Sequence, residues 1–272
     1  MGDSVHLIDS TTVALSELSA TWARFSRTAC GAKLHLVLDP DADRPVHADI
    51  TPSTVNDITA AKAMPITPGV TYVFDLGYYD FAWWAKLDAA GCRIVTRLKA
   101  NTPLSDVIEL EIPEEIRREG AILSDRIGQL PARLQRSQRN PFQDPVREVC
   151  VRIQTGKVLR IMSNDLDAPA QEIADLYKRR WAIELFFRWV KQTLRITHFL
   201  GTSENAVRIQ IIVALIAHML LRLAQAAQTA VESPIAFARL VRANLMHRRR
   251  IDRLLTTSPP AQSNAQLVLA WN

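Results

Sequence analysis

The sequence has 272 residues, of which 48% are hydrophobic and 22% charged, and its formal net charge is +5. This composition excludes an intrinsically disordered or fibrous protein, and the length allows one large domain or two modest ones. Between Glu172 and Arg253, 14 Lys and Arg stand against 6 Asp and Glu, so the rest of the chain carries a net charge of −3. A basic C-terminal third suits a polyanionic partner, although many basic proteins bind no nucleic acid.

Cysteine spacing and the longest apolar run exclude further classes of protein. Cys30, Cys92 and Cys150 lie far apart without metal-ligand spacing, which argues against a disulfide framework and a structural zinc site. No secretory signal opens the chain. The most apolar run, 209–221, has 13 residues, whereas a membrane span needs roughly 20. We therefore expect a buried helix there, no membrane association and a cytoplasmic protein.

The first hundred residues alternate between predicted strands and helices. Apolar runs predict strands at 5–9, 33–38, 45–50, 70–75 and 93–98. Short helices are predicted at 56–64 and 81–90, and Gly91 ends the second. This order favours a mixed sheet covered by helices. Two of the strands end on carboxylates, Asp9 and Asp75, and α/β proteins tend to build their sites at strand ends.

The texture of the chain changes after residue 100. Several prolines and short alternating stretches predict a β-rich insertion, and helical periodicity returns over 170–194 and 203–227. A further helix is predicted after Ser233, with a basic run at 247–250. The predicted organisation is a first core part (1–100), the β-rich insertion (101–168), a second, helical core part (169–227) and a basic helical tail (228–272).

One face of the helix predicted at 170–194 carries Tyr177, Arg180, Glu184 and Lys191. At about 100° per residue, these spacings return near the starting direction, so the four side chains form one row. The alternative is a solvated helix face with an ordinary Glu184–Arg180 pair, which contributes only tenths of a kcal/mol. The two strand-end aspartates, found independently, favour a functional row.

Two aspartates and a glutamate suit metal-dependent chemistry on DNA. Cutting and rejoining DNA needs a strong nucleophile and stabilisation of charge at an in-line phosphorus, which two divalent cations about 3.5–4 Å apart supply. Hard cations such as Mg²⁺ prefer carboxylate oxygens. We predict that Asp9, Asp75 and Glu184 bind the metal ions, while the other three side chains of the row contact DNA phosphates.

The spacing Y-(2)-R-(3)-E-(6)-K of this row resembles the signature of bacterial insertion-sequence transposases of the insertion-sequence-four group. The surrounding segments agree, with YKRRWAIELFF at 177–187 and FLGTSENA at 199–206. The blocks IDST at 8–11 and VFDLGYYD at 73–80 look like the first and second catalytic motifs of that group. The resemblance covers about four fifths of the chain, from Val5 to Leu221.

The resemblance implies an α/β fold: an RNase H-like mixed sheet with flanking helices, interrupted by a β-rich insertion before the glutamate-bearing helix. It implies a DDE transposase with Asp9, Asp75 and Glu184 as catalytic and metal-binding residues. Mg²⁺ is the expected cofactor, for which Mn²⁺ substitutes, and the expected partners are terminal inverted repeats, target DNA and further copies of the chain on paired ends. Related proteins usually carry an additional N-terminal DNA-binding domain, which this chain is expected to lack. A DNA-binding remnant and a stand-alone RNase H-like nuclease are the alternatives.

Other polar residues compete for roles at this site. Asp39 is predicted to be a turn residue, Asp57 to cap or begin a helix, and Asp80 to cap a helix or lie behind the metal ligands. Arg97 and Lys99 at a strand end either hold DNA phosphate or are simply exposed.

The remaining aromatic and basic candidates are weaker. The Trp83–Trp84 pair is predicted to be core, and His198 and His218 to be ordinary satisfied histidines. The densest basic cluster either covers a solvated helix face or contacts DNA, and it is counted among the predicted DNA-binding residues. It consists of Arg248, Arg249, Arg250 and Arg253, of which the first three are the predicted DNA-binding residues.

Overall fold

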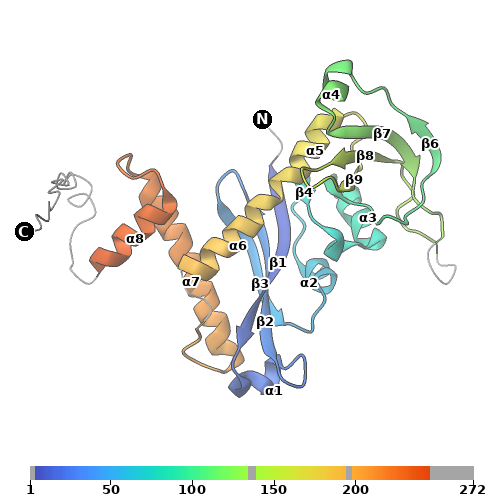
Figure 1. The fold of residues 1–272 in the computed structure, drawn as a ribbon. Coiled ribbons are helices and arrows are strands. Elements are labelled where there is room, and N and C mark those ends of the chain that lie inside the picture. Colours follow the sequence, from blue (N-terminus) through green and yellow to red (C-terminus); the bar gives the residue numbers. More distant parts are fainter. Residues whose placement is uncertain (1–3, 134–138, 194–197, 246–272) are drawn as a thin grey trace, which may run out of the picture. The chain divides into compact units, whose positions relative to one another are not determined.

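The computed structural model describes residues 4–133, 139–193 and 198–245, and the chain divides into two compact units, 1–215 and 216–272. The described part of the first unit contains one nine-stranded sheet with helices packed against it (Figure 1). Its strands are β1 (Val5–Leu15), β2 (Cys30–Asp39), β3 (Arg44–Pro52), β4 (Thr71–Val73), β5 (Arg93–Arg97), β6 (Ser105–Glu109), β7 (Ile122–Gln129), β8 (Val146–Arg152) and β9 (Val158–Ser163). Its helices are η1 (Glu17–Ser19), α1 (Ala20–Ala23), α2 (Asp57–Ala63), η2 (Leu76–Tyr78), α3 (Phe81–Ala89), α4 (Glu114–Glu119), α5 (Ala170–Arg179) and α6 (Trp181–Thr193).

The strand order is β3-β2-β1-β4-β5-β9-β8-β7-β6. The first three strands form an antiparallel meander, whereas β1, β4 and β5 run parallel to one another. Parallel neighbours need a crossover, and α3 supplies it between β4 and β5. From β9 to β6 the sheet is antiparallel again. The prediction of a mixed sheet flanked by helices is confirmed.

Alternating side chains of β1 divide the core into two layers. Val5, Leu7 and Val13 belong to a cluster with the apolar faces of α5 and α6, whereas Ile8 belongs to a cluster with α2 and α3. Successive strand residues point to opposite faces, so each layer takes every second residue. Trp83 and Trp84 are buried in the α2–α3 layer, which confirms their prediction as core.

Two predicted elements have different limits in the structure. The strand predicted to end at Asp9 continues to Leu15, because 10–15 pair with β2 despite their polar side chains. The single helix predicted over 170–194 is two helices, α5 and α6, which follow one another in Figure 1. They meet at Arg180, where the backbone makes tighter i→i+3 bonds: Arg180 N–H donates to Tyr177 O, and Ile183 N–H donates to Arg180 O.

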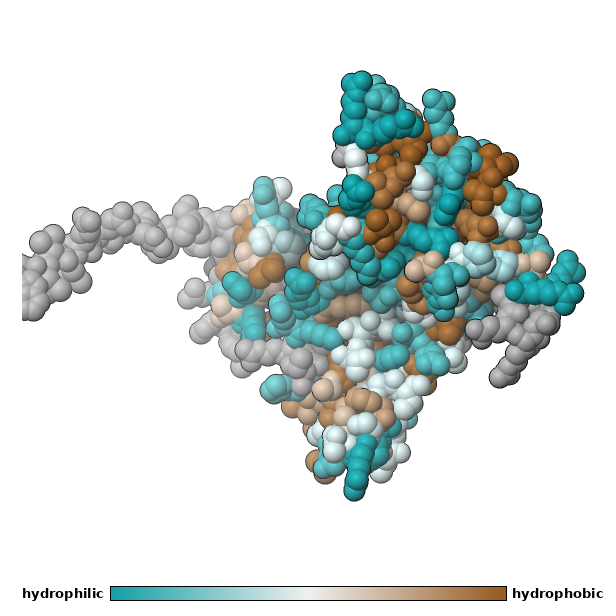
Figure 2. Space-filling view, turned by 45° about the vertical axis from the view of Figure 1, so that its right-hand side comes forward, coloured by the Kyte–Doolittle hydropathy of each residue, from teal (hydrophilic) through white to brown (hydrophobic). Residues whose placement is uncertain are grey.

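The four strands β6 to β9 lie within the segment that the sequence marks as a β-rich insertion, and they continue the same sheet. Two carboxylates are buried here, and both are paired: Asp125 with Arg147, and Glu148 with Arg126 and Arg160. On the face shown in Figure 2, hydrophobic patches lie among hydrophilic side chains. Exposed apolar side chains of β6 to β9 and the loops between them include Val107, Ile108, Leu123, Ile153 and Val158.

Helix α7 (Glu204–Ala226) confirms the helix predicted over 203–227, and the boundary between the two units falls within it. Among the described helices, α7 is long and apolar enough to cross a membrane, with a mean hydropathy of 1.8 in its most apolar window, of which 28% is buried. One such helix is weak evidence for a membrane span. The prediction of a buried helix over 209–221 holds only in part, because one face is buried and the other exposes apolar side chains, among them Ile209, Val213 and Leu220. In the second unit, α8 (Pro234–Asn244) begins at Ser233, whose hydroxyl accepts from Ala236 N–H.

Candidate active site

Asp9 and Asp75 lie at corresponding places on two neighbouring strands. The parallel pairing of β1 with β4 ends at Leu7 opposite Val73, and each aspartate follows two residues later. Asp9 therefore lies within β1 but at the point where β1 separates from β4. Each carboxylate accepts a backbone hydrogen bond of 2.8 Å, Asp9 from Ser10 N–H and Asp75 from Gly77 N–H.

Arg180 connects the glutamate-bearing helix to β1. Its two terminal nitrogens contact different carboxylates, Asp9 at 3.3 Å and Glu184 at 2.5 Å. The tightened turn between α5 and α6 puts Arg180 at this junction. Because one guanidinium reaches both groups, the structure brings Glu184 to Asp9 across 175 residues of sequence.

The electrostatics of Asp9 connect it with both other carboxylates. The pKa of Asp9 is raised to about 6, mainly by burial and in addition by the negative charges of Asp75 and Glu184. The Ser10 hydrogen bond and the charge of Arg180 act in the opposite direction. A buried carboxylate whose ionisation is disfavoured by neighbouring negative charges is typical of a functional site.

The other two residues of the row also face this end of the sheet. Tyr177 is buried, and its hydroxyl accepts a hydrogen bond from Arg97, with Arg180 and Asp75 nearby. Burial raises the pKa of this hydroxyl, so it stays protonated and can donate. Lys191 Nζ donates to Thr12 O at 2.8 Å, which ties α6 to β1. All four residues of the predicted row thus point toward β1 or β5.

The structure separates the competing candidates. Asp39 accepts from Asp41 and Ala42 N–H and is a turn residue, as predicted. Asp80 caps α3 through Trp83 N–H and pairs with Lys62.

Arg97, the last residue of β5, and Lys99, two residues later, have different environments. Arg97 reaches the site through Tyr177, whereas Lys99 lies over the Tyr79 ring at 4.4 Å.

Asp57 begins α2 as predicted, but its side chain bonds to β1 and β2. The sequence gives no signal for these contacts, because Asp57 lies 47 residues from its partner Ser10. The basic cluster Arg248, Arg249 and Arg250 lies outside the described residues.

The donor set suits hard divalent cations. Asp9, Asp75 and Glu184 offer carboxylate oxygens, and their mutual repulsion leaves room for positive charge. In the described part of the chain, no three such side chains already stand at coordinating spacing. Arg180 takes the place of a cation between Asp9 and Glu184, so metal binding requires these side chains to rearrange.

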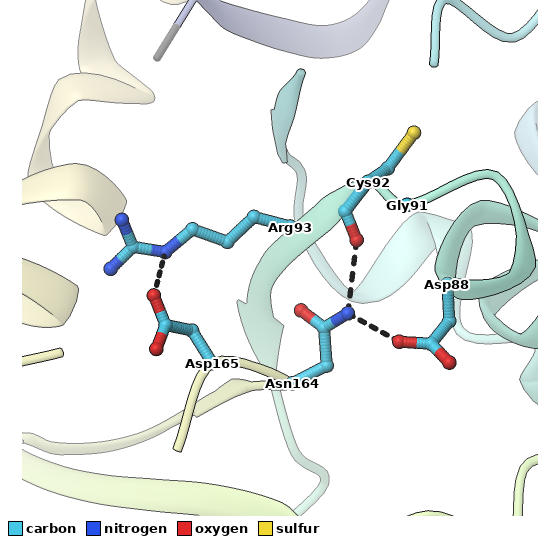
Figure 3. A pocket seen from close by; sticks show the side chains of 6 residues that line it. All are labelled: Asp88, Gly91, Cys92, Arg93, Asn164 and Asp165. Carbon is cyan, nitrogen blue, oxygen red and sulfur yellow. Dashed lines mark hydrogen bonds and ion pairs between the residues drawn. The ribbon is translucent and has the colours of Figure 1, made fainter. Parts of the chain in front are cut away.

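A pocket of about 290 Å³ lies elsewhere, at the start of β5 (Figure 3). It is shallow and open, and its polar groups are already bonded to one another: Arg93 pairs with Asp165, and Asn164 donates to Asp88 and to Cys92 O. The carboxylate site lies toward the other end of β5, where the last residue of the strand, Arg97, contacts Tyr177. We therefore interpret the residues that line this pocket as structural.

Comparison with known proteins identifies the family of the chain. A family model described as the transposase DDE domain matches residues 1–220. The transposase y4zB of Sinorhizobium fredii is 38% identical over 247 residues, which cover 91% of this chain and 68% of that protein. The transposase for insertion sequence element IS5377 of Geobacillus stearothermophilus is 31% identical over 222 residues, covering 80% of this chain and 56% of that protein. This chain is thus shorter than both relatives.

Among solved structures, the chain is similar to a piggyBac transposase synaptic complex with hairpin DNA. The TM-score is 0.49 at 12% identity, and the match covers 97% of this chain and 60% of that one. The family model, which spans about four fifths of the sequence, and the insertion-sequence relatives decide the assignment: the chain belongs to the transposase DDE domain family.

Proposed function

We propose that this chain is the catalytic part of a DNA transposase that cleaves DNA at the ends of its element and joins the freed 3′ hydroxyl to target DNA. The observation that carries the proposal is that Arg180 joins Asp9 to Glu184, while the charge of Asp75 acts on Asp9 from the end of the neighbouring strand. Family membership supports the reaction class. The strand order β3-β2-β1-β4-β5, with an antiparallel meander followed by parallel strands, supports an RNase H-like core.

In this proposal the three carboxylates hold Mg²⁺ or Mn²⁺, which supplies activation of the attacking oxygen and stabilisation of charge at phosphorus. The partly buried site excludes much of the bulk water, which strengthens every charge interaction in it. First, water attacks the phosphodiester in line and the 3′ oxygen leaves. The freed 3′ hydroxyl then attacks a phosphodiester of the target, so each step forms one P–O bond and breaks another.

The basic side chains of the row would hold the DNA backbone. Arg180 has a planar guanidinium suited to bidentate contact with a phosphate once it leaves Asp9 and Glu184, and the Tyr177 ring centroid lies 5.8 Å from it. Lys191 reaches a phosphate only if it leaves Thr12 O. We further propose action as a homo-oligomer on paired ends, in the cytoplasm, with the segment 101–168 as an insertion into the core.

The test uses purified protein, a plasmid with the gene's own flanking DNA, and Mg²⁺ or Mn²⁺. Asp75→Ala and Glu184→Gln remove proposed metal ligands, whereas Glu172→Gln is the matched control. Glu172 lies on α5, is 48% exposed and pairs with Arg93 away from the site. We expect nicks at defined flanking positions with the wild type and with Glu172→Gln, and none with the other two.

The alternatives predict different products. A stand-alone nuclease cuts but yields no joined strands. A DNA-binding remnant retains flanking DNA in a mobility-shift assay, yet cuts nothing with either metal. Equal cleavage by wild type and Glu184→Gln would contradict the proposed site itself.

A further inference from the structure

A second carboxylate network lies behind the site, on the opposite face of β1. Asp57 Oδ1, at the first residue of α2, accepts from Ser10 Oγ at 2.7 Å and from Lys33 Nζ at 3.0 Å. His35 Nδ1 lies 3.7 Å from the same oxygen. Ser10 follows Asp9 in β1, so its side chain points to the face that Asp9 does not occupy. Asp57 is therefore bonded to the back of the strand that carries a proposed catalytic group.

Asp57 bonds to one of the two residues whose backbone N–H groups hold the proposed catalytic aspartates, and it lies near the other. Ser10, which it bonds through the hydroxyl, donates its N–H to Asp9. Gly77 donates its N–H to Asp75, and a Cβ at Gly77 would lie 3.5 Å from Asp57 Oδ2. The same Cβ would lie 3.0 Å from Asp75 Oδ1, so the glycine leaves room for a close approach. The Asp57 side chain thus bonds to the support on β1 and lies beside the support in η2.

The charge of Asp57 suits a supporting role. Lys33 neutralises it in a half-buried pair, with side chains 17% and 26% exposed. Asp57 can therefore hold Ser10 without adding net negative charge to three carboxylates that already repel one another. The hydrogen bonds of its carboxylate go to Ser10 and Lys33 rather than to helix α2. The N-cap of α2 is Asn56, which makes no side-chain cap bond. Asp80, in contrast, caps the next helix directly.

We propose that Asp57, held by Lys33, is a positioning residue that fixes Ser10 and thereby the carboxylate of Asp9, and that it packs beside Gly77, whose N–H holds Asp75. The inference rests on the proposed function, because it concerns the same site. Residues that orient metal ligands from behind typically change metal affinity or activity by about 10–100-fold when they are lost.

The test compares Mn²⁺ affinity of the full chain, by titration without DNA, with the rate of flanking-DNA cleavage at saturating metal. Ser10→Ala removes the hydroxyl bond, Asp57→Asn removes the charge, and Ser10→Thr restores a hydroxyl. Asp80→Asn is the matched control, since Asp80 is equally exposed at 26%, also pairs with a lysine, and touches neither support. We expect Mn²⁺ affinity and cleavage rate to fall roughly tenfold in Ser10→Ala and Asp57→Asn. Ser10→Thr and Asp80→Asn are expected to stay near the wild type.

The results separate this inference from the function on which it rests. Wild-type cleavage together with unchanged affinity and rate in both Ser10→Ala and Asp57→Asn overturns the positioning role alone. A wild type that binds Mn²⁺ but never cuts overturns the proposed reaction, while weaker binding in the variants still supports positioning. A wild type that binds no Mn²⁺ overturns both. A thermal shift in Asp80→Asn equal to that of Asp57→Asn shows that lost stability does not cause the lost affinity.

Discussion

Two regions of the molecule bury carboxylates in different ways. The carboxylates of β7 and β8 are fully paired with arginines, whereas those of the proposed active site are not. Asp125 and Glu148 are 3% and 0% exposed. Arg147 donates two hydrogen bonds to Asp125, at 2.8 and 2.6 Å, and Glu148 is held by two guanidiniums, Arg126 and Arg160. Buried charges of this kind are tolerated because they are paired and hydrogen-bonded.

The proposed active site is less well compensated. Asp9 and Glu184 share one guanidinium, and Asp75 adds a third negative charge, so ionisation of Asp9 is disfavoured. The proposed active site has fewer positive charges than carboxylates, and a bound metal ion would supply the missing positive charge. We therefore interpret this deficit as a sign of function. Where charge is balanced, we expect stability to depend on it. Where it is unbalanced, we expect activity to depend on it.

The largest effects should come from the same change made in both regions. Glu184→Gln is expected to lower the cleavage rate on the order of a thousandfold while leaving the melting temperature near that of the wild type. Glu148→Gln is expected to cost about 3–5 kcal/mol of unfolding free energy, because two guanidiniums lose their charged partner. Cleavage assays and denaturant unfolding measure the two. A large stability loss in Glu184→Gln would contradict the comparison.

The pKa of Asp9 predicts a dependence of stability on pH. Its folded-state pKa of about 6 lies above the ordinary value of 3.8, so the folded state binds a proton more tightly than the unfolded state. Stability from this group is present below about pH 4 and is lost as pH rises through 6, by about 3 kcal/mol. Asp9→Asn should abolish this loss and be more stable than the wild type at pH 7.5 in a metal-free buffer, while abolishing cleavage. Parallel pH profiles of unfolding for the two proteins would refute it.

Sequence reasoning found the elements and the residues whose signals are local. Apolar runs such as VTYVFD at 70–75 and the helical spacing of Tyr177, Arg180 and Glu184 depend on neighbours along the chain. It missed the extension of β1 beyond Asp9, because polar residues in a strand are stabilised by pairing with β2 rather than by their own pattern.

Contacts between residues far apart in the sequence could not be predicted. Asp57 reads as a helix start, and only the fold shows that it bonds Ser10 and Lys33. Arg97 reads as a strand-end charge until the structure places it against Tyr177, 80 residues later. The division of the predicted helix into α5 and α6 was missed for a related reason. It brings the Arg180 guanidinium to Asp9 on β1, a contact that helical periodicity cannot predict.

Arg180 provides a smaller test of the charge deficit. Arg180→Gln removes the cation that Asp9 and Glu184 share, so Mn²⁺ no longer competes with a guanidinium and its affinity should rise a few-fold. DNA affinity should fall, and the slope of log affinity against log salt should become shallower by about 1 if Arg180 contacts a phosphate. Calorimetry with Mn²⁺ and mobility shifts at several salt concentrations measure both. Weaker Mn²⁺ binding would mean that Arg180 organises the carboxylates more than it competes for them.

The smallest effect is expected at the start of β5, where Asn164 has partners for both atoms of its side-chain amide. Asn164 Oδ1 accepts from Ile94 N–H, and its Nδ2 donates to Asp88 and to Cys92 O (Figure 3). Asn164→Ala leaves these groups unsatisfied and should cost about 1–3 kcal/mol, measured by denaturant unfolding. Asn164→Asp should cost more at pH 7, because it puts a second carboxylate beside Asp88. Cleavage by the folded fraction should stay unchanged in both. If it falls, the two ends of β5 are coupled, and the division between a stabilising and a reacting region does not hold within this strand.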